Sequence, residues 1–280
     1  MPEKKLSRRE RFKRFLKRNM TPLWAKRFSY QVISFLVSVA MVVGVAMYAF
    51  TKSYDERTLS FTKGFTITAH AGAFNTSPNS LETVNAAIEH GVDILEVDIR
   101  QRPDGTVVMG HDIITTNNDG VEVTLLFETV KPAKIKLNLD IKDTRSLPML
   151  HDLIFEYGLE KRVFLTGIES FQANTAAEKC PGIDYYINYS PSRFKIFSED
   201  YQEKLLGMLE ETGGIGINCN HAYASKTLCD MLHDHGYKLS VWTADKKYHI
   251  KRMLIIKPDN ITTRQVELLQ SIIDNWGKKK

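Results

Sequence analysis

Cysteine is scarce in this sequence, with three residues in 280: Cys180, Cys219 and Cys229. None belongs to a C-x-x-C pair, and the odd count permits at most one bridge, so a disulfide-rich scaffold is excluded. Pairing of Cys219 with Cys229 stays open. The sequence also lacks a P-loop, zinc-finger spacing and a G-x-S-x-G motif. An apolar fraction of 43% and a charged fraction of 25% are typical of a chain that folds around a core.

The 250 residues after residue 30 have no excess of basic charge. Residues 1–30 hold 11 Lys/Arg and two acids, so the other 250 residues hold 27 of the 38 basic and 31 of the 33 acidic side chains. A folded domain that binds nucleic acid usually carries basic charge on its own surface. We therefore expect no nucleic-acid partner, because the net charge of +5 arises from a basic N-terminal segment.

One long hydrophobic run is present near the N-terminus. Residues 28–51 contain no formally charged side chain. About 20 mostly apolar residues let a helix cross a bilayer core of ~30 Å, and the absence of a polar stripe disfavours a buried helix of a soluble protein. We therefore predict a transmembrane helix at residues 31–50, between a basic segment at 1–30 and a linker at 51–63.

The charges that flank this run predict its orientation. Nine Lys/Arg lie within residues 8–27, whereas residues 52–63 are nearly balanced in charge. The positive-inside rule then places the N-terminus in the cytoplasm and predicts a single-pass protein of the cell membrane with an extracytoplasmic domain. A cleaved signal peptide is the alternative, although the basic segment is long for one. Residues 8–19 can also lie on an anionic leaflet as an amphipathic helix, or act only as a topology signal.

After residue 63 the sequence alternates short β-rich runs with helical patterns. The expected strands are residues 65–70, 94–100, 136–140, 163–167, 185–189, 216–218, 238–243 and 260–263, and the expected helices are residues 80–90, 147–157, 171–180, 199–211, 224–235, 246–256 and 265–276. Strand-then-helix repetition predicts an α/β fold, a TIM-type (β/α)8 barrel of residues 64–280, with a doubly wound open sheet as the alternative. Residues 101–130 interrupt the pattern, and an additional hairpin with a strand at 106–111 is expected there.

Three acidic side chains fall near the ends of neighbouring expected strands. Glu96 and Asp98 are two residues apart on one strand, so both face the same side of it, and Asp140 ends the next. Carboxylates that converge inside a barrel repel one another unless a cation holds them. Oxygen ligands suit a hard ion, so we predict a site for one divalent cation, Mg²⁺ or Ca²⁺.

Two histidines are expected at the same rim of the barrel. His70 ends the first strand and His111 ends the hairpin, and the chemistry of such barrels gathers where strands end. Beside a hard-metal site, they are predicted to be an acid–base pair rather than ligands of a softer metal.

These residues resemble the motifs of the glycerophosphodiester phosphodiesterase family, which is related to phosphatidylinositol-phospholipase-C-like phosphodiesterases. The family has an HRG-type motif, then P-E-N-T-L, G-x-x-x-x-E-x-D, a D-G turn and H-D. This sequence has HAG at 70–72, PNSL at 78–81, GVDILEVD at 91–98, DG at 104–105 and HD at 111–112. LDIK at 139–142, SF at 170–171, VWT at 241–243 and DNI at 259–261 extend the likeness over residues 65–268.

The resemblance implies a role for each of eight side chains. Glu96, Asp98 and Asp140 would hold one divalent metal, while His70 and His111 would act as general base and general acid, in an order that stays open. The remaining three would bind substrate: Lys142 by neutralising the phosphate, Trp242 by walling the pocket, and Asn79.

Four departures from the family pattern bear on the substrate. Ala71 stands where the family has an arginine, so one bidentate phosphate contact is missing. Pro78 stands opposite the glutamate of P-E-N-T-L, and Asp140 is one methylene shorter than the usual glutamate, as in sphingomyelinase D-type barrels. Arg264 replaces the acid of the family's final T-D-R-P motif.

We therefore expect metal-dependent hydrolysis of a glycerophosphodiester-type phosphodiester, with release of an alcohol and a phosphomonoester such as glycerol 3-phosphate. The partner would be a small phosphodiester, a lipid headgroup, a deacylated phospholipid or a glycerol-phosphate polymer of the envelope. A lyase that forms a cyclic phosphate, and a catalytically silent, membrane-anchored barrel that binds phosphorylated ligands, are the alternatives. The oligomeric state stays open.

Overall fold

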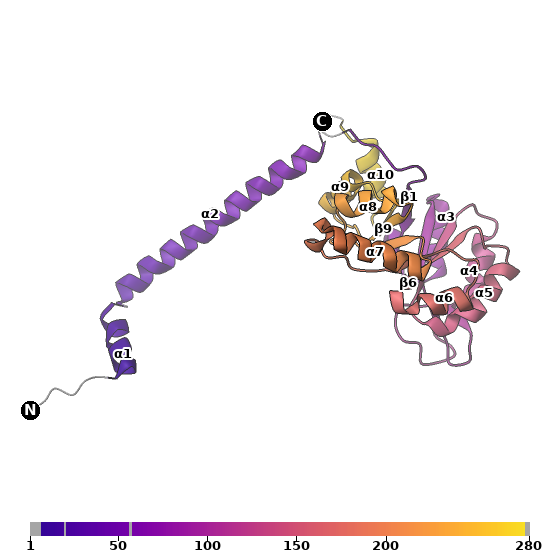
Figure 1. The fold of residues 1–280 in the computed structure, drawn as a ribbon, viewed down its shortest axis with the longest axis horizontal. Helices are drawn as coiled ribbons and strands as arrows, with labels where there is room; N and C mark the ends of the chain where they lie inside the picture. Colours follow the sequence, from indigo (N-terminus) through magenta and orange to yellow (C-terminus); the bar gives the residue numbers. More distant parts are fainter. Residues whose placement is uncertain (1–6, 20, 56–57, 278–280) are drawn as a thin grey trace, which may run out of the picture. The chain divides into compact units, whose positions relative to one another are not determined.

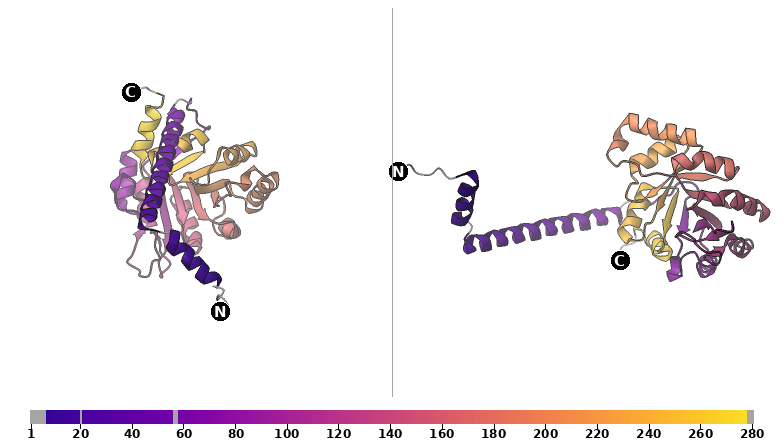
Figure 2. Two further views of the ribbon diagram at one scale, coloured as in Figure 1. Left: turned by 90° about the vertical axis from the view of Figure 1, so that its left-hand side faces the viewer. Right: turned by 90° about the horizontal axis from the view of Figure 1, so that it is seen from below.

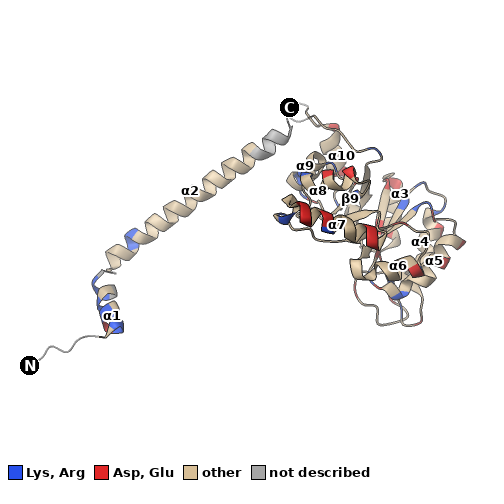
Figure 3. Cartoon of the chain, in the orientation of Figure 1, with Lys and Arg blue, Asp and Glu red and all other residues tan. Residues whose placement is uncertain are grey.

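The computed structural model describes residues 7–19, 21–55 and 58–277. The chain divides into two units, residues 1–56 and 57–280. The first contains helix α1 (Arg8–Asn19) and helix α2 (Pro22–Asp55) (Figure 1). Within α2, Pro22–Ala49 is long and apolar enough to cross a membrane. Figure 3 shows Lys and Arg on α1 and at the beginning of α2, next to this apolar stretch.

The second unit is a closed barrel of parallel strands, which confirms the predicted fold. Within residues 58–277, its eight strands are β1 (Thr66–Ala69), β2 (Ile94–Gln101), β5 (Lys136–Ile141), β6 (Val163–Ile168), β7 (Tyr185–Asn188), β8 (Gly216–Asn220), β9 (Lys238–Trp242) and β10 (Asn260–Thr263). Strand β1 pairs with both β2 and β10, so the described sheet closes on itself rather than ending at two edges as a doubly wound sheet would.

Helices surround the strands on the outside of the barrel (Figure 2). They are α3 (Leu81–Glu89), α5 (Leu147–Glu156), α6 (Ala173–Lys179), α7 (Glu199–Thr212), α8 (Lys226–Asp234), α9 (Lys247–Ile256) and α10 (Val266–Asp274). Serine side chains cap the N-termini of two of these helices. Ser80 accepts a hydrogen bond from the Thr83 N–H at the start of α3, and Ser225 accepts one from the Leu228 N–H at the start of α8. Because the eight strands are parallel, the βα connections all begin at the same rim of the barrel.

Alternation along the strands separates the core from the barrel interior. On β2, Leu95, Val97 and Ile99 are fully buried in the hydrophobic core, while Glu96 and Asp98 line a cavity on the other face. The period of two in a strand produces this division directly.

The segment after β2 differs from the expected hairpin. Strand β3 (Val107–Met109) is shorter than predicted and pairs antiparallel with β2, and it is followed by β4 (Val121–Glu122) and helix α4 (Val123–Val130), which were not predicted. Val123, Leu126, Phe127 and Val130 of α4 are buried, and burying them favours a helix over a loop.

The three cysteines are free and buried, so Cys219 and Cys229 form no bridge in this structure. Burial raises the pKa of each thiol to about 12, which keeps the sulfur protonated.

Candidate active site

A cavity of about 310 Å³ opens at the rim where the parallel strands end. Its lining is mostly polar and comes from strands around the whole barrel: His70, Glu96, Asp98, His111, Asn138, Asp140, Lys142, Thr166, Asn188, Asn218, Trp242, Thr243, Thr262 and Arg264. Seven of the eight residues predicted for the site are in this set; Asn79 is the exception.

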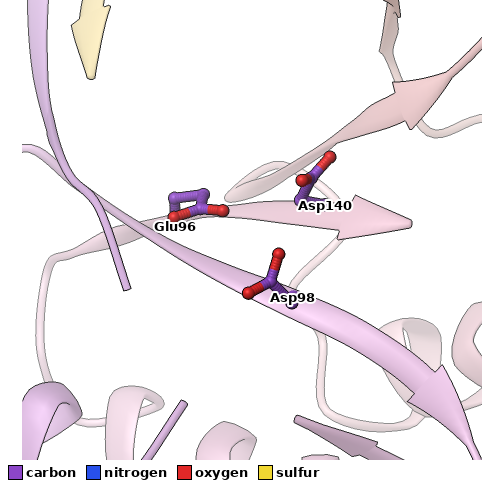
Figure 4. A group of neighbouring side chains, drawn as sticks. All are labelled: Glu96, Asp98 and Asp140. Carbon is purple, nitrogen blue, oxygen red and sulfur yellow. The ribbon is translucent and has the colours of Figure 1, made fainter. Parts of the chain in front are cut away.

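The three predicted acids form one cluster in this cavity. In the parallel pairing of β2 with β5, Asp98 lies opposite Asp140, and Glu96 is one inward-facing position earlier. Each residue offers a carboxylate oxygen within 4.8 Å of those of the other two, and Figure 4 shows the carboxylates turned toward a common space. Glu96 and Asp98 are 4% and 3% exposed, so water solvates them little.

The surroundings of Glu96 disfavour its ionised form. Burial, and then the charges of Asp140 and Asp98, raise its pKa well above the usual value. Its Oε2 accepts a hydrogen bond from the Ala71 N–H at 2.8 Å, and His70 Nδ1 lies 3.5 Å from the same oxygen. Deprotonated Glu96 would thus be stabilised by an additional positive charge.

Asp98 is fixed by a buried asparagine. The Asn79 side-chain amide donates to Asp98 Oδ2 at 2.8 Å, and Asn79 Oδ1 accepts from the Asp98 N–H at 2.9 Å. Asn79 has a positive φ of 55°, which asparagine tolerates better than most residues. Substrate binding by Asn79 stays a prediction, whereas its contacts orient Asp98.

Lys142 connects two of the acids. Its Nζ lies 2.6 Å from Asp140 Oδ2 and 3.1 Å from Asp98 Oδ1. Burial alone would lower the pKa of Lys142, but the two carboxylates more than offset this and raise it, so the side chain is a permanent cation. It offsets part of the negative charge of the cluster.

Asp140 is held from the neighbouring strand β6. Thr166 Oγ1 lies 3.0 Å from Asp140 Oδ1 and 2.8 Å from Asn138 Oδ1, so its one hydroxyl proton is shared between these two oxygens. Gly167 follows with a positive φ of 76°. A Cβ at Gly167 would lie 2.6 Å from Asp140 Oδ1, so glycine is required for this close approach. Neither residue was recognised from the sequence, because the contact depends on how β5 and β6 are paired.

The two histidines line the same cavity in different environments. The His70 side chain is 19% exposed, and burial is the main cause that lowers its pKa. His111 is 68% exposed at the mouth, where its Nδ1 lies 2.9 Å from Asp112 Oδ1. His70 is therefore favoured as the neutral imidazole, whereas His111 is exposed beside Asp112.

The donor set of the acidic cluster fits a hard divalent cation. The three residues offer only oxygen atoms, the oxygens lie close together, and the buried charge is incompletely balanced by Lys142. These observations support a metal site and leave Mg²⁺ and Ca²⁺ equally suited.

Comparison with known proteins yields consistent similarities. The family described as the glycerophosphoryl diester phosphodiesterase family matches residues 70–196. A protein from Caldanaerobacter subterraneus subsp. tengcongensis named glycerophosphodiester phosphodiesterase is 22% identical over an alignment of 253 positions; the alignment covers 75% of this chain and 98% of that protein.

Solved structures resemble the barrel in fold. A glycerophosphodiester phosphodiesterase from Parabacteroides distasonis matches with a TM-score of 0.62 and 19% identity, covering 76% of this chain and 98% of that chain. An Oleispira antarctica phosphodiesterase in complex with the product sn-glycerol-3-phosphate matches with a TM-score of 0.62 and 17% identity, covering 80% and 99%. At these identities the likeness establishes the fold alone.

Proposed function

Because the chain belongs to the glycerophosphoryl diester phosphodiesterase family, a group of phosphoric diester hydrolases, we propose that its barrel hydrolyses a glycerophosphodiester to an alcohol and a phosphomonoester such as glycerol 3-phosphate. One observation carries the proposal: a buried cluster of three carboxylates shares a cavity of about 310 Å³ with two histidines. The Oleispira antarctica relative was solved with sn-glycerol-3-phosphate as its product, which supports this product class.

Glu96, Asp98 and Asp140 would hold one divalent cation, Mg²⁺ or Ca²⁺. Such a cation, when bound, polarises a phosphoryl oxygen as a Lewis acid. Asn79 and Thr166 contact two of the carboxylates and would orient them toward such a cation.

Lys142 and the two histidines would act on the phosphodiester itself. Lys142 supplies a fixed positive charge beside the phosphate. Neutral His70 accepts the proton of the attacking hydroxyl, which belongs to water or to the substrate's neighbouring alcohol, and His111 donates a proton to the leaving alcohol oxygen. Attack by water gives a phosphomonoester, whereas attack by the neighbouring hydroxyl gives a cyclic phosphate. Trp242 is 37% exposed and lines the cavity, where it would form part of the wall of the substrate pocket.

A product analysis tests the proposed reaction. Purified full-length protein is incubated with glycerophosphoethanolamine, glycerophosphoglycerol and a glycerol-phosphate oligomer, with Mg²⁺ or Ca²⁺, and products are followed by ³¹P NMR. We expect a phosphomonoester, loss of turnover with a chelator, and recovery when the cation is returned. A cyclic phosphate as the final product would indicate a lyase. No turnover of any substrate would favour a barrel that only binds phosphorylated ligands.

We further propose that the chain is anchored in the cell membrane by α2, with its N-terminus in the cytoplasm and the barrel outside. The apolar stretch Pro22–Ala49 and the basic α1 that precedes it support this topology. The domain boundaries at residues 30, 50 and 63 stay predictions.

The native cysteines allow a simple topology test, because all three are buried. A membrane-impermeant thiol reagent is expected to label Glu178→Cys in intact cells, and Ser7→Cys only after the cells are opened; both positions are exposed. Labelling of both in intact cells would contradict the orientation. A shortened, soluble product that has lost residue 7 would indicate a cleaved signal sequence.

A further inference from the structure

The cavity contains two permanently charged basic side chains among its described lining residues, and they are not equivalent. Lys142 lies deep in the site and is engaged by Asp98 and Asp140 at 3.1 and 2.6 Å. Arg264 lies after β10, and its side chain is 46% exposed. Lys142 is thus largely committed to the acidic cluster, whereas Arg264 reaches the cavity from the mouth.

Backbone pairing places Arg264 beside His70. Ala69 is paired with Thr263 between β1 and β10, and the His70 N–H donates to the Thr263 carbonyl at 3.0 Å. His70 follows Ala69 and Arg264 follows Thr263, and both residues line the cavity. The charge of Arg264 also lowers the pKa of His70, which is consistent with their proximity.

Asp245, in the loop after β9, holds this arginine. The Arg264 N–H donates to Asp245 Oδ1 at 2.8 Å, and Nη1 donates to Asp245 Oδ2 at 2.9 Å. Thr263 Oγ1 donates to the Ala244 carbonyl at 2.9 Å and lies 3.3 Å from Asp245 Oδ1. A guanidinium has five N–H donors in a planar fork, so one ion pair with Asp245 uses only part of its capacity.

We propose that Arg264, positioned by Asp245, binds the phosphate of the substrate at the mouth of the cavity. The inference rests on the proposed function for the identity of the ligand, a phosphodiester or its phosphomonoester product. It gives this chain a guanidinium contact to phosphate although alanine occupies position 71. The Ala71 side chain is buried and its N–H donates to Glu96, so position 71 offers no side chain to a phosphate. The proposed contact comes instead from the end of β10, the strand that pairs with β1.

A purely structural role accounts for this arrangement less well. An ion pair exposed to this degree contributes little to folding, and Arg145 forms a comparable pair with Asp143 at 2.6 Å outside the cavity. The planar fork of arginine matches two phosphate oxygens, and a cation facing a hollow beside His70 is placed for an anionic ligand.

Binding measurements on the full-length protein test the proposal without relying on turnover. Calorimetry with inorganic phosphate and with glycerol 3-phosphate compares wild type with Arg264→Gln, Arg264→Lys and the matched control Arg145→Gln. We expect Arg264→Gln to raise Kd about tenfold, Arg264→Lys to raise it less because charge remains without the fork, and Arg145→Gln to leave it unchanged. In the phosphodiester assay, Arg264→Gln should raise KM more than it lowers kcat, because a contact present before and during reaction is lost.

Each outcome decides the question. Phosphate affinity within twofold of wild type in Arg264→Gln, or an equal loss in Arg145→Gln, would overturn the proposal. If Arg264→Gln does not fold, the Arg264→Lys variant decides the question. A phosphate Kd equal to that of wild type would overturn the proposal, and a raised Kd would support it. Asp245→Asn should weaken phosphate binding in the same direction, because the guanidinium loses its orientation. A wild-type protein that binds phosphate through Arg264 but turns over no phosphodiester would defeat the proposed function and leave this inference standing.

Discussion

Replacing Glu96 by glutamine is expected to lower kcat/KM at least about a thousandfold while raising the melting temperature of the metal-free protein. Glutamine keeps an oxygen that can accept the Ala71 N–H, so the local hydrogen bond survives. It removes one of the three charges that would hold the cation. Function and stability should therefore change in opposite directions at one position.

The stability gain follows from the raised pKa of Glu96. Burial, then Asp140 and Asp98, raise that pKa in the folded protein, whereas the unfolded chain ionises near the usual value of 4.5. Folding therefore disfavours the ionised side chain and costs stability. This cost is absent at pH values below the pKa of Glu96 in the unfolded chain, and it grows with pH until the pH exceeds the pKa of Glu96 in the folded protein. For a domain of this size each kcal/mol shifts the melting temperature by about 2–4 °C, so a rise of a few degrees is expected at neutral pH.

Thermal unfolding with a chelator and calorimetry with Mg²⁺ or Ca²⁺ measure the two effects. Metal affinity of the wild type should fall as the pH falls, because a proton competes with the cation for Glu96. The exposed Glu156→Gln variant is the control and should match wild type in both measurements. Wild-type metal affinity in Glu96→Gln, or a lower melting temperature without metal, would contradict the assignment.

The barrel was predictable because its signal is local and repeated. Each strand of the barrel begins or ends within two residues of the expected position, and β10 coincides with residues 260–263. Helix α4 was missed although Val123, Leu126, Phe127 and Val130 follow the helical spacing i, i+3, i+4, i+7. The turn residues and short strands around it obscured that pattern.

The acidic cluster was also predictable, since two residues on one strand and one on the next must meet at the rim. The residues that orient it were not. Thr166 reaches Asp140 from the adjacent strand, and Asn79 reaches Asp98 from a left-handed turn 19 residues earlier. Arg264 stood in the sequence only as a departure from a family motif, and its place beside His70 required the closure of β1 on β10. Contacts across the barrel depend on three-dimensional pairing that no local pattern contains.

Alanine at either cavity histidine is expected to lower kcat by about 10²–10⁴, but the two variants should respond differently to the leaving group. His70 is mostly buried with a lowered pKa, which suits a base that removes a proton from the nucleophile. His111 is exposed beside Asp112, which suits an acid that protonates the departing alcohol. A p-nitrophenyl phosphodiester needs no proton on its leaving oxygen. His111→Ala should therefore recover most activity on that substrate, and His70→Ala should not.

Steady-state rates on an alkyl and a p-nitrophenyl phosphodiester, across pH, measure this difference. Because His70 must be neutral to accept a proton, wild-type kcat/KM should fall only below the usual histidine pKa of 6.5, and this acidic limb should vanish in His70→Ala. His235→Ala, which alters an exposed histidine at the end of α8, is the control and should keep wild-type rates. Recovery of His70→Ala instead of His111→Ala would reverse the roles, and full activity of both variants would remove the histidines from the reaction.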